Sequence, residues 1–311
     1  MPKEPDRIAL ARLPTPLEAL HFDWKGRSHQ LWIKRDDLTG TVLSGNKIRK
    51  LEYLLCDAKN RGARRILTCG GLQSNHCRAT AVAAARLGLQ TTVYLRVRQP
   101  EMLAMPPTGN WRLCSQVGAD IRFITPEEYT ERHSLMANDA GPHDVVIPEG
   151  GSNALGAWGY IRAVDEMAEQ WEEAPSSIVC AVGSGGTLAG LIMGVARRGL
   201  RIPVLGVCVC DDRKTFQRIV STITEDAQAI WPELNLVPAD DVSIIEGYVG
   251  RGYALTTPEE SQDIAAMARS TGTFLDPVYT GKAFRALLCE PELFGPRPLF
   301  VHTGGIFGLL A

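Results

Sequence analysis

The stretch AVGSGGTLAGLIMG, residues 181–194, decides the fold class of this 311-residue chain. It continues the apolar run SSIVC, so a buried strand ends in a glycine-rich turn and a helix begins at once. Glycines let the backbone turn sharply, and free N–H groups at a helix start point at an anion. The loop is therefore a candidate phosphate site; the alternative is a tight turn that only connects a strand to a helix. Its residues are Gly183, Ser184, Gly185, Gly186 and Thr187.

The same alternation of apolar strands and helix-like segments runs through the chain. A helix is predicted at 74–88, and strands at 64–71, 91–97, 119–125, 143–151, 176–186, 203–210 and 297–305. Strands this apolar between helices are typical of parallel sheets covered on both faces. The sequence therefore predicts an α/β fold, in which ligands bind where strands end and helices begin. The segments SGNK, CGGLQSNH, PEGGSN, GSGGT and VHTGG all lie at such junctions.

The composition restricts the class of protein. A net charge of -2 and a pI near 6.3 do not suggest nucleic acid or an anionic membrane as a partner. No segment has the ~18 consecutive apolar residues of a membrane helix, and the first residues do not resemble a secretory signal. The eight cysteines form no C-x-x-C pair, which predicts reduced core thiols in a cytoplasmic protein and no metal site.

The segment LSGNKIRKLEYLL, residues 43–55, places two lysines at the start of an amphipathic helix. Positive charge there opposes the helix macrodipole, so either both lysines are solvated or an anion compensates them. Lys47 becomes a Schiff-base nucleophile if partial burial or the charge of Lys50 lowers its pKa. Lys50 could also pair with a phosphate. A phosphate-bearing aldehyde between this segment and the glycine loop explains both lysines, and that cofactor is pyridoxal phosphate.

Six segments in chain order resemble one family. They are SGNKIRKLEYLL, GGLQSNHCRAT, GGSNALGAWGY, GSGGTLAG, DPVYTGK and HTGG, and they resemble the D-cysteine desulfhydrase and 1-aminocyclopropane-1-carboxylate deaminase group. The resemblance, from TPLEAL to HTGG, implies a pyridoxal-phosphate enzyme with the two-domain tryptophan-synthase-β-like fold (fold type II). Each domain is expected to be an open, mostly parallel sheet flanked by helices. Residues 1–50 plus 151–311 would form the larger cofactor-binding domain, and 51–150 a smaller α/β domain closing over the cofactor. A homodimer is also implied.

The resemblance implies a role for each cofactor-binding residue. Lys47 is expected to bind the cofactor's aldehyde covalently and later to move the substrate's proton. Asn75 is expected to bond the ring hydroxyl, Thr303 to face the pyridine nitrogen, and Tyr279 to lie beside the ring. The phosphate is expected to be bound by Lys50, Gly183, Ser184, Gly185, Gly186 and Thr187.

The resemblance also implies contacts with a small amino-acid substrate. Ser74 is expected to bind the substrate carboxylate together with Asn75 and His76. Ser74 and Asn75 are also natural N-caps of the following helix, and capping alone would explain them. Tyr253, in GRGYAL, matches a second active-site tyrosine of the group, and Thr280 is a further predicted substrate contact. The predicted catalytic set is Lys47, Ser74, Tyr253 and Tyr279.

The predicted reaction is β-elimination. A threonine hydroxyl at 303 cannot protonate the pyridine ring as a carboxylic acid can, so the cofactor should be a weaker electron sink. Thr280, Thr303 and His76 match the desulfhydrases, whereas the deaminases resemble DPVYEGK and HLGG and tend to carry Gln in place of His. We therefore expect conversion of D-cysteine to pyruvate, hydrogen sulfide and ammonia. The continuation Ile306-Phe307-Gly308 departs from typical desulfhydrases, which leaves L-cysteate sulfo-lyase and the deaminase as alternatives.

Three alternatives come from other classes. An NAD(P)-dependent oxidoreductase would use Gly183, Gly185 and Asp211, but Leu188 stands where the third glycine belongs, and SGNKIRK stays unexplained. A serine acyl enzyme would read Ser44 and Lys47 as S-x-x-K, without its K-T-G and S-D-N partners. A non-catalytic binding module would leave Lys47 without a chemical role.

Overall fold

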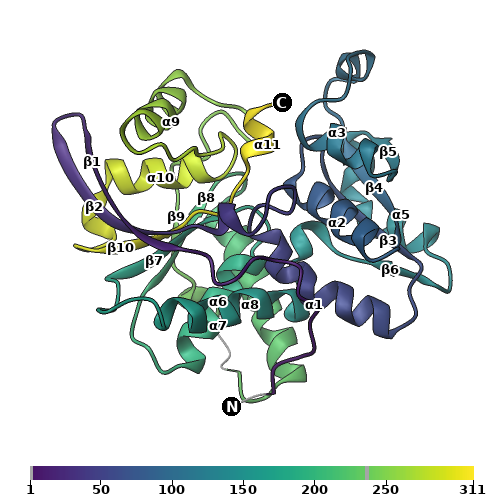
Figure 1. Cartoon of the computed structure of the whole chain (residues 1–311), viewed down its shortest axis with the longest axis horizontal. Helices are drawn as coiled ribbons and strands as arrows, with labels where there is room; N and C mark the ends of the chain where they lie inside the picture. Colours follow the sequence, from purple (N-terminus) through teal and green to yellow (C-terminus); the bar gives the residue numbers. More distant parts are fainter. Residues whose placement is uncertain (1–2, 235–237) are drawn as a thin grey trace.

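Two sheets organise the chain in the computed structural model, which describes residues 3–234 and 238–311 (Figure 1). The strand orders are β1-β2-β10-β7-β8-β9 in the larger sheet and β5-β4-β3-β6 in the smaller one. Every pairing is parallel except that of β1 with β2, so the predicted α/β fold is confirmed. The strands are β1 Leu17–Trp24, β2 Arg27–Lys34, β3 Arg65–Gly71, β4 Gln90–Arg96, β5 Asp120–Ile124, β6 Asp144–Val146, β7 Ser177–Val182, β8 Val204–Cys208, β9 Ile244–Ile245 and β10 Pro298–Val301.

Helices cover both faces of each sheet (Figure 1). Apolar side chains of α6, α7 and α8 pack on one face of the larger sheet, and those of α9 and α10 pack on the other. The helices are α1 Lys47–Asn60, α2 Asn75–Arg86, α3 Gly109–Gln116, α4 Pro126–Thr130, α5 Arg132–Asp139, α6 Ala154–Ala168, α7 Gly186–Arg197, α8 Arg213–Ile230, α9 Pro258–Thr271, α10 Thr280–Cys289 and α11 Ile306–Leu309. Short 3-10 turns are η1 Asp36–Leu38, η2 Pro100–Ala104, η3 Glu149–Gly151, η4 Ala239–Asp241 and η5 Pro291–Leu293.

The hairpin of β1 and β2 was not among the predicted strands. Its two-residue turn has positive φ at Lys25 (47°) and Gly26 (76°), as hairpin turns of this length require. The hairpin lies at the edge of the sheet and alternates exposed with buried residues, so it lacks the continuous apolar run of the central strands. The seven predicted strands and the helix after β3 are present, with ends shifted by a few residues.

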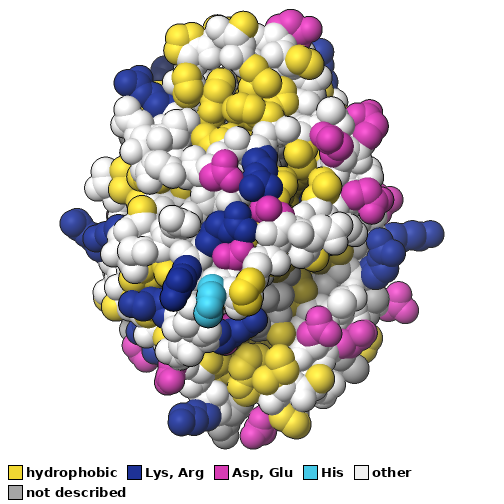
Figure 2. All heavy atoms as spheres, turned by 90° about the vertical axis from the view of Figure 1, so that its right-hand side faces the viewer, with side chains coloured by type: hydrophobic (Ala, Val, Ile, Leu, Met, Phe, Trp, Pro, Cys, Tyr) yellow, Lys and Arg dark blue, Asp and Glu magenta, His cyan; other side chains and the backbone are white. Residues whose placement is uncertain are grey.

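The four strands of the smaller sheet all lie between residues 65 and 146, and the larger sheet takes its strands from before and after them. The predicted domain boundaries themselves stay a prediction. Figure 2 shows the face on the side of the smaller sheet, where hydrophobic side chains gather toward the top. The exposed large apolar side chains of this part of the chain are Met102, Leu103, Met105 and Phe123.

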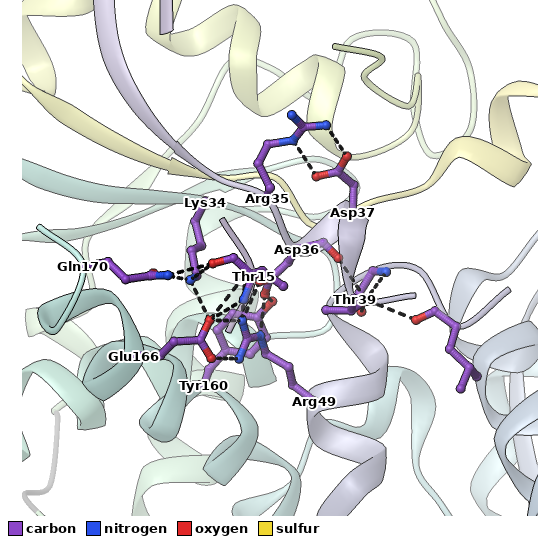
Figure 3. Close-up of polar contacts among 12 residues, drawn as sticks. Thr15, Lys34, Arg35, Asp36, Asp37, Thr39, Arg49, Tyr160, Glu166 and Gln170 are labelled. Atoms are coloured by element: carbon purple, nitrogen blue, oxygen red, sulfur yellow. Dashed lines mark hydrogen bonds and ion pairs between the residues drawn. The ribbon is translucent and has the colours of Figure 1, made fainter. Parts of the chain in front are cut away.

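A buried cluster of charges ties α1 to the larger sheet (Figure 3). Arg49 donates to both carboxylate oxygens of Asp36 at 2.7 and 2.8 Å and to Glu166 at 2.9 Å. Lys34 pairs with Glu166 at 2.6 Å. Burial would raise the pKa of Glu166, but Arg49 and Lys34 lower it to about 2. Because Arg49 lies between Lys47 and Lys50 in α1, this cluster fixes the helix that carries both lysines.

The cysteines follow the prediction with one correction. All eight are free, and six are buried, but Cys289 is exposed and is therefore not a core thiol. Among residues 3–234 and 238–311, no group of His, Cys, Asp or Glu side chains could hold a metal ion. No helix in these same ranges is both long and apolar enough to cross a membrane.

Candidate active site

A cavity lies where the carboxyl ends of β3 and β7 meet the starts of α1, α2 and α7. This is the junction at which α/β sheets bind ligands. The cavity brings together residues that are far apart in the sequence. Those predicted from the sequence are Lys47, Ser74, Asn75, His76, Gly183, Ser184, Gly185, Thr187, Tyr253, Tyr279 and Thr303.

Lys47 is the first residue of α1, and its half-buried side chain faces the cavity. Nζ donates to Oδ1 of Asn46 at 3.0 Å. Burial, with a smaller effect from the charge of Arg78, lowers the pKa of Lys47 to about 8, although the carboxylates of Asp276 and Glu149 act to raise it. Burial is the main cause of the shift. The predicted amine of lowered pKa is thus present, although the effect does not come chiefly from Lys50.

Lys50 is fully buried one turn further along α1. Nζ donates to the carbonyl of Gly150 at 3.2 Å and to Oγ of Ser152 at 3.3 Å. It pairs with no carboxylate in the described part of the chain, and burial together with the charge of Lys47 holds its pKa well below the usual value. A Cβ built on Gly186 would lie 2.9 Å from Nζ, so this ammonium faces the first turn of α7. The side chain of Lys50 and the N-terminus of α7 therefore both contribute positive potential to the same place.

The glycine loop shapes the wall above Lys50. Gly185 has φ +78°, and α7 begins at Gly186, whose N–H donates to Oγ of Ser152 at 3.2 Å. The hydroxyls of Ser152 and Ser184 are 2.9 Å apart. Ser152 thus joins the loop to Lys50, and the sequence-based site did not include it, although it lies in the quoted segment GGSNALGAWGY.

The turn before α1 lies against the segment HTGG. The N–H of Asn46 donates to the carbonyl of Thr303 at 3.1 Å, and Nδ2 of Asn46 donates to Oγ1 of Thr187 at 3.0 Å. Gly45 has φ +104°, and a Cβ there would lie 2.8 Å from the carbonyl oxygen of Thr303. This close approach requires glycine. Asn46 and Glu149 are two further cavity residues that sequence reasoning missed.

The start of α2 supplies polar groups from the opposite side. Oγ of Ser74 accepts from the N–H of Cys77 at 3.2 Å, so its capping role is present. Nε2 of His76 lies 2.8 Å from Oγ1 of Thr68, which already donates its proton to the carbonyl of Ile147. Nε2 must therefore be the donor. Burial and the charges of Lys47 and Lys50 hold the pKa of His76 well below its usual value, so the imidazole is neutral.

Two tyrosines close the cavity. The hydroxyls of Tyr253 and Tyr279 are 2.9 Å apart, and the rings meet edge to face with centroids 6.1 Å apart. A Cβ on Gly183 would lie 2.9 Å from Cε1 of Tyr279, so the ring can pack at this position only because residue 183 has no side chain. Burial raises the pKa of Tyr253 to about 12. Both phenols are therefore protonated near neutral pH.

Three predicted site residues do not line the cavity. Lys50 and Gly186 adjoin it, because Lys50 bonds the lining residue Gly150 and Gly186 follows the lining residue Gly185. The third is Thr280. It is fully buried, and its hydroxyl bonds Oδ1 of Asp276 at 2.7 Å and accepts from the N–H of Asp276 at 2.7 Å. Both hydrogen-bonding directions of the hydroxyl are thus used within the turn before α10. The geometry gives no support to the predicted substrate contact at Thr280.

Comparisons with known proteins find a family model and named relatives that match nearly the whole chain. A family model described as pyridoxal-phosphate dependent enzyme matches residues 8–304. A Thermotoga maritima protein named putative 1-aminocyclopropane-1-carboxylate deaminase is 42% identical, over 98% of this chain and 98% of that protein. An Arabidopsis thaliana protein named bifunctional D-cysteine desulfhydrase/1-aminocyclopropane-1-carboxylate deaminase, mitochondrial, is 40% identical, over 97% of this chain and 79% of that protein.

Solved structures share the fold. The crystal structure of a protein described as an ACC deaminase homologue superimposes with a TM-score of 0.85 at 34% identity, covering 99% of this chain and 94% of that one. A threonine deaminase from T.th., at 20% identity and a TM-score of 0.64 over 89% of this chain and 87% of its own, shares the fold alone. The predicted two-domain fold of the tryptophan-synthase-β-like type is confirmed at the level of fold class.

Proposed function

This chain belongs to the family of pyridoxal-phosphate dependent enzymes, and we propose that it cleaves the carbon–sulfur bond of D-cysteine. It is a pyridoxal-phosphate dependent lyase of the deaminase and desulfhydrase group. The oxidoreductase, serine acyl-enzyme and binding-module alternatives are therefore wrong. The observation that carries the role of the cofactor is the buried side chain of Lys50, which faces the start of α7, beside a half-buried Lys47 of lowered pKa.

The residues of the cavity fit this cofactor. Lys50 is buried without a carboxylate partner in the described residues, and it faces the first turn of α7, where the helix dipole favours negative charge, which suits a phosphate. Any side chain at position 186 would fill this space, since a Cβ would lie within 2.9 Å of both Lys50 and Ser152. Lys47 would hold the aldehyde carbon through Nζ. Asn75 and Thr303 lie on the cavity wall, where they would bond the ring.

Pyridoxal phosphate, once bound, supplies an electron sink for the Cα of the amino acid attached to it. Lys47 would supply the base, because lowering its pKa from 10.5 to about 8 leaves a much larger fraction of the amine unprotonated, and able to accept the Cα proton, near neutral pH. Ser74 would orient the substrate carboxylate beside the start of α2, where helix N–H groups favour negative charge. Tyr253 and Tyr279 keep their protons and could donate one to a departing thiolate.

The choice of D-cysteine rests on the side chains around the cavity. Thr303 lines it and offers a hydroxyl, not a carboxylic acid, to the ring. A cofactor without strong protonation of its ring suits a reaction in which a leaving group carries electrons away. The cyclopropane deaminase is the second candidate, favoured by a 40% identical relative named for both reactions. L-Cysteate sulfo-lyase is a third, because Ile306-Phe307-Gly308 after the HTGG segment departs from typical desulfhydrases.

A product assay separates these candidates. The purified enzyme is incubated with D-cysteine, L-cysteine, L-cysteate, β-chloro-D-alanine and 1-aminocyclopropane-1-carboxylate, and pyruvate and 2-oxobutyrate are measured. We expect pyruvate and sulfide from D-cysteine, and no 2-oxobutyrate. Lys47→Ala should abolish turnover, whereas Lys59→Ala, at an exposed position of the same helix, should not change it. Release of 2-oxobutyrate from the cyclopropane substrate would move the assignment to the deaminase.

The cytoplasmic location and the homodimer are also proposals. Sedimentation of the purified protein tests the dimer, and a single species with the mass of one chain contradicts it.

A further inference from the structure

Asn75 begins α2 at the cavity wall, and its amide can face the cavity with either end. With Nδ2 it donates hydrogen bonds, and with Oδ1 it accepts them. The orientation decides which form of a bound group it recognises. Contacts behind the cavity determine this orientation, because Oδ1 of Asn75 lies 2.9 Å from Nδ2 of Asn110.

Arg78, one turn further along α2, determines which atoms donate and which accept in these contacts. A guanidinium has donors only. Nε of Arg78 donates to Oδ1 of Asn110 at 3.1 Å, and its terminal nitrogens donate to the carbonyls of Val42 at 2.7 Å and Ser44 at 2.9 Å. Arg78 is buried, so water does not compete for these three hydrogen bonds. The atom of Asn110 that faces Arg78 must therefore be its oxygen.

Asn110, in α3, connects Arg78 to Asn75 and so fixes the orientation of the Asn75 amide. Because its Oδ1 faces Arg78, its Nδ2 points the other way and donates to Oδ1 of Asn75 and to the carbonyl of Gln73 at 3.0 Å. A backbone carbonyl only accepts, so the contact with Gln73 fixes the same orientation independently. Asn110 is fully buried and has no room to exchange partners with solvent. The Nδ2 of Asn75 is thereby left to face the cavity.

We propose that Arg78 and Asn110 are positioning residues that hold Asn75 as an obligate hydrogen-bond donor toward the cavity. Asn75 then selects an acceptor oxygen. This inference rests on the proposed function, in which that oxygen is the ring oxygen of the cofactor, and it adds that the anionic form of this oxygen is the one stabilised. A donor that cannot invert favours the deprotonated oxygen over the hydroxyl.

The positioning residues also join separate parts of the chain. Arg78 lies in α2, Asn110 in α3, and the carbonyls of Val42 and Ser44 precede Lys47. The ring of Phe307, in α11, lies 5.1 Å from the guanidinium carbon of Arg78. Phe307 belongs to the segment that departs from typical desulfhydrases, and its place over Arg78 gives it a structural role behind the cavity.

The substitution Asn110→Asp tests the inference. The carboxylate keeps the shape of the side chain and can still accept from Arg78, so the fold should persist, but it cannot donate to Asn75. Asn75 is then free to invert and present Oδ1. We expect the affinity of the apo-protein for pyridoxal phosphate to fall about tenfold to a hundredfold in a titration followed by absorbance. The pH at which the bound cofactor's absorption changes should rise. Asn138→Asp, the same change at an exposed position of α5, should alter neither.

A double-mutant cycle with Asn75→Ala separates positioning from general structure. If Asn110 acts through Asn75, Asn110→Asp should weaken binding in the wild type and change it less than twofold in the Asn75→Ala background. Equal losses in both backgrounds, or no loss in either, overturn the inference. If Asn75→Ala itself leaves affinity unchanged, the proposed role of Asn75 is what fails. Asn110→Ala, which introduces no buried carboxylate, is measured in the same cycle. It should also weaken binding in the wild type and change it less than twofold in the Asn75→Ala background.

Discussion

The phenol oxygens of Tyr253 and Tyr279 lie 2.9 Å apart at the cavity wall, although 26 residues separate them in the sequence. One phenol donates to the other, so one proton of the pair remains free for a bound molecule. Tyr279 also lies against Gly183 of the glycine loop. Lys47 and Ser74 line the same cavity, so we propose that this proton serves the leaving group of a substrate bound there.

Removing either hydroxyl should slow turnover without releasing the cofactor. We expect Tyr253→Phe and Tyr279→Phe to lower kcat about 10²-fold to 10⁴-fold, the usual contribution of a positioned proton donor. The visible absorption of the bound cofactor should stay the same. Steady-state kinetics of pyruvate release measure the effect. Wild-type kcat in both variants contradicts a role in proton transfer.

Gly186→Ala should prevent phosphate binding. The added Cβ would lie 2.7 Å from Oγ of Ser152 and 2.9 Å from Nζ of Lys50, in the space that the phosphate needs. The affinity for pyridoxal phosphate should fall by more than tenfold, as it should in Lys50→Met, since each loses charge-assisted bonds worth about 1.5–3 kcal/mol. Titration of apo-protein with the cofactor gives both constants. The control is Lys59→Met, an exposed lysine of the same helix. Unchanged affinity in Lys50→Met means that the phosphate lies elsewhere.

The pH dependence of cofactor attachment should report the pKa of Lys47. Only the neutral amine attacks an aldehyde, and burial lowers the pKa of Lys47 from its usual 10.5 to about 8. The rate at which apo-protein gains visible absorption after mixing with pyridoxal phosphate should therefore rise with pH and reach half its maximum near pH 8. A midpoint near 10.5 shows that the amine is not perturbed.

The sequence was sufficient to predict the parallel strands and most of the cavity wall, because both depend on local patterns. Apolar runs define the strands, and glycine-rich junctions mark the start of α1, α2 and α7. Ser152, Asn46 and Asn110 were missed because their roles depend on partners 32 to 141 residues away, such as Ser184 and Thr187. The predicted substrate contact at Thr280 lacks support for a different and local reason. Its neighbour Asp276, four residues back, takes up the hydroxyl, and the local pattern does not reveal this.

Asp36→Asn should destabilise the protein. Asp36 is fully buried and accepts from Arg49, Thr15 and Tyr160, so its loss leaves a buried arginine with less compensation (Figure 3). We expect the free energy of unfolding to fall by about 3–5 kcal/mol. Asp57→Asn, which breaks the exposed pair with Arg61, should change it by only about 0.5 kcal/mol. Urea denaturation compares the two, and similar values for both would mean that the buried cluster does not hold α1.

The most direct test of the account locates the lysine that carries the cofactor. The holoenzyme is reduced with borohydride and digested, and the peptides are sequenced by mass spectrometry. We expect a pyridoxyl-phosphate group on Lys47, absent from Lys47→Ala, with Lys50 unmodified although it lies only one helical turn away. Modification of Lys50 or of any other lysine in place of Lys47, or no modified lysine in a yellow holoenzyme, contradicts it.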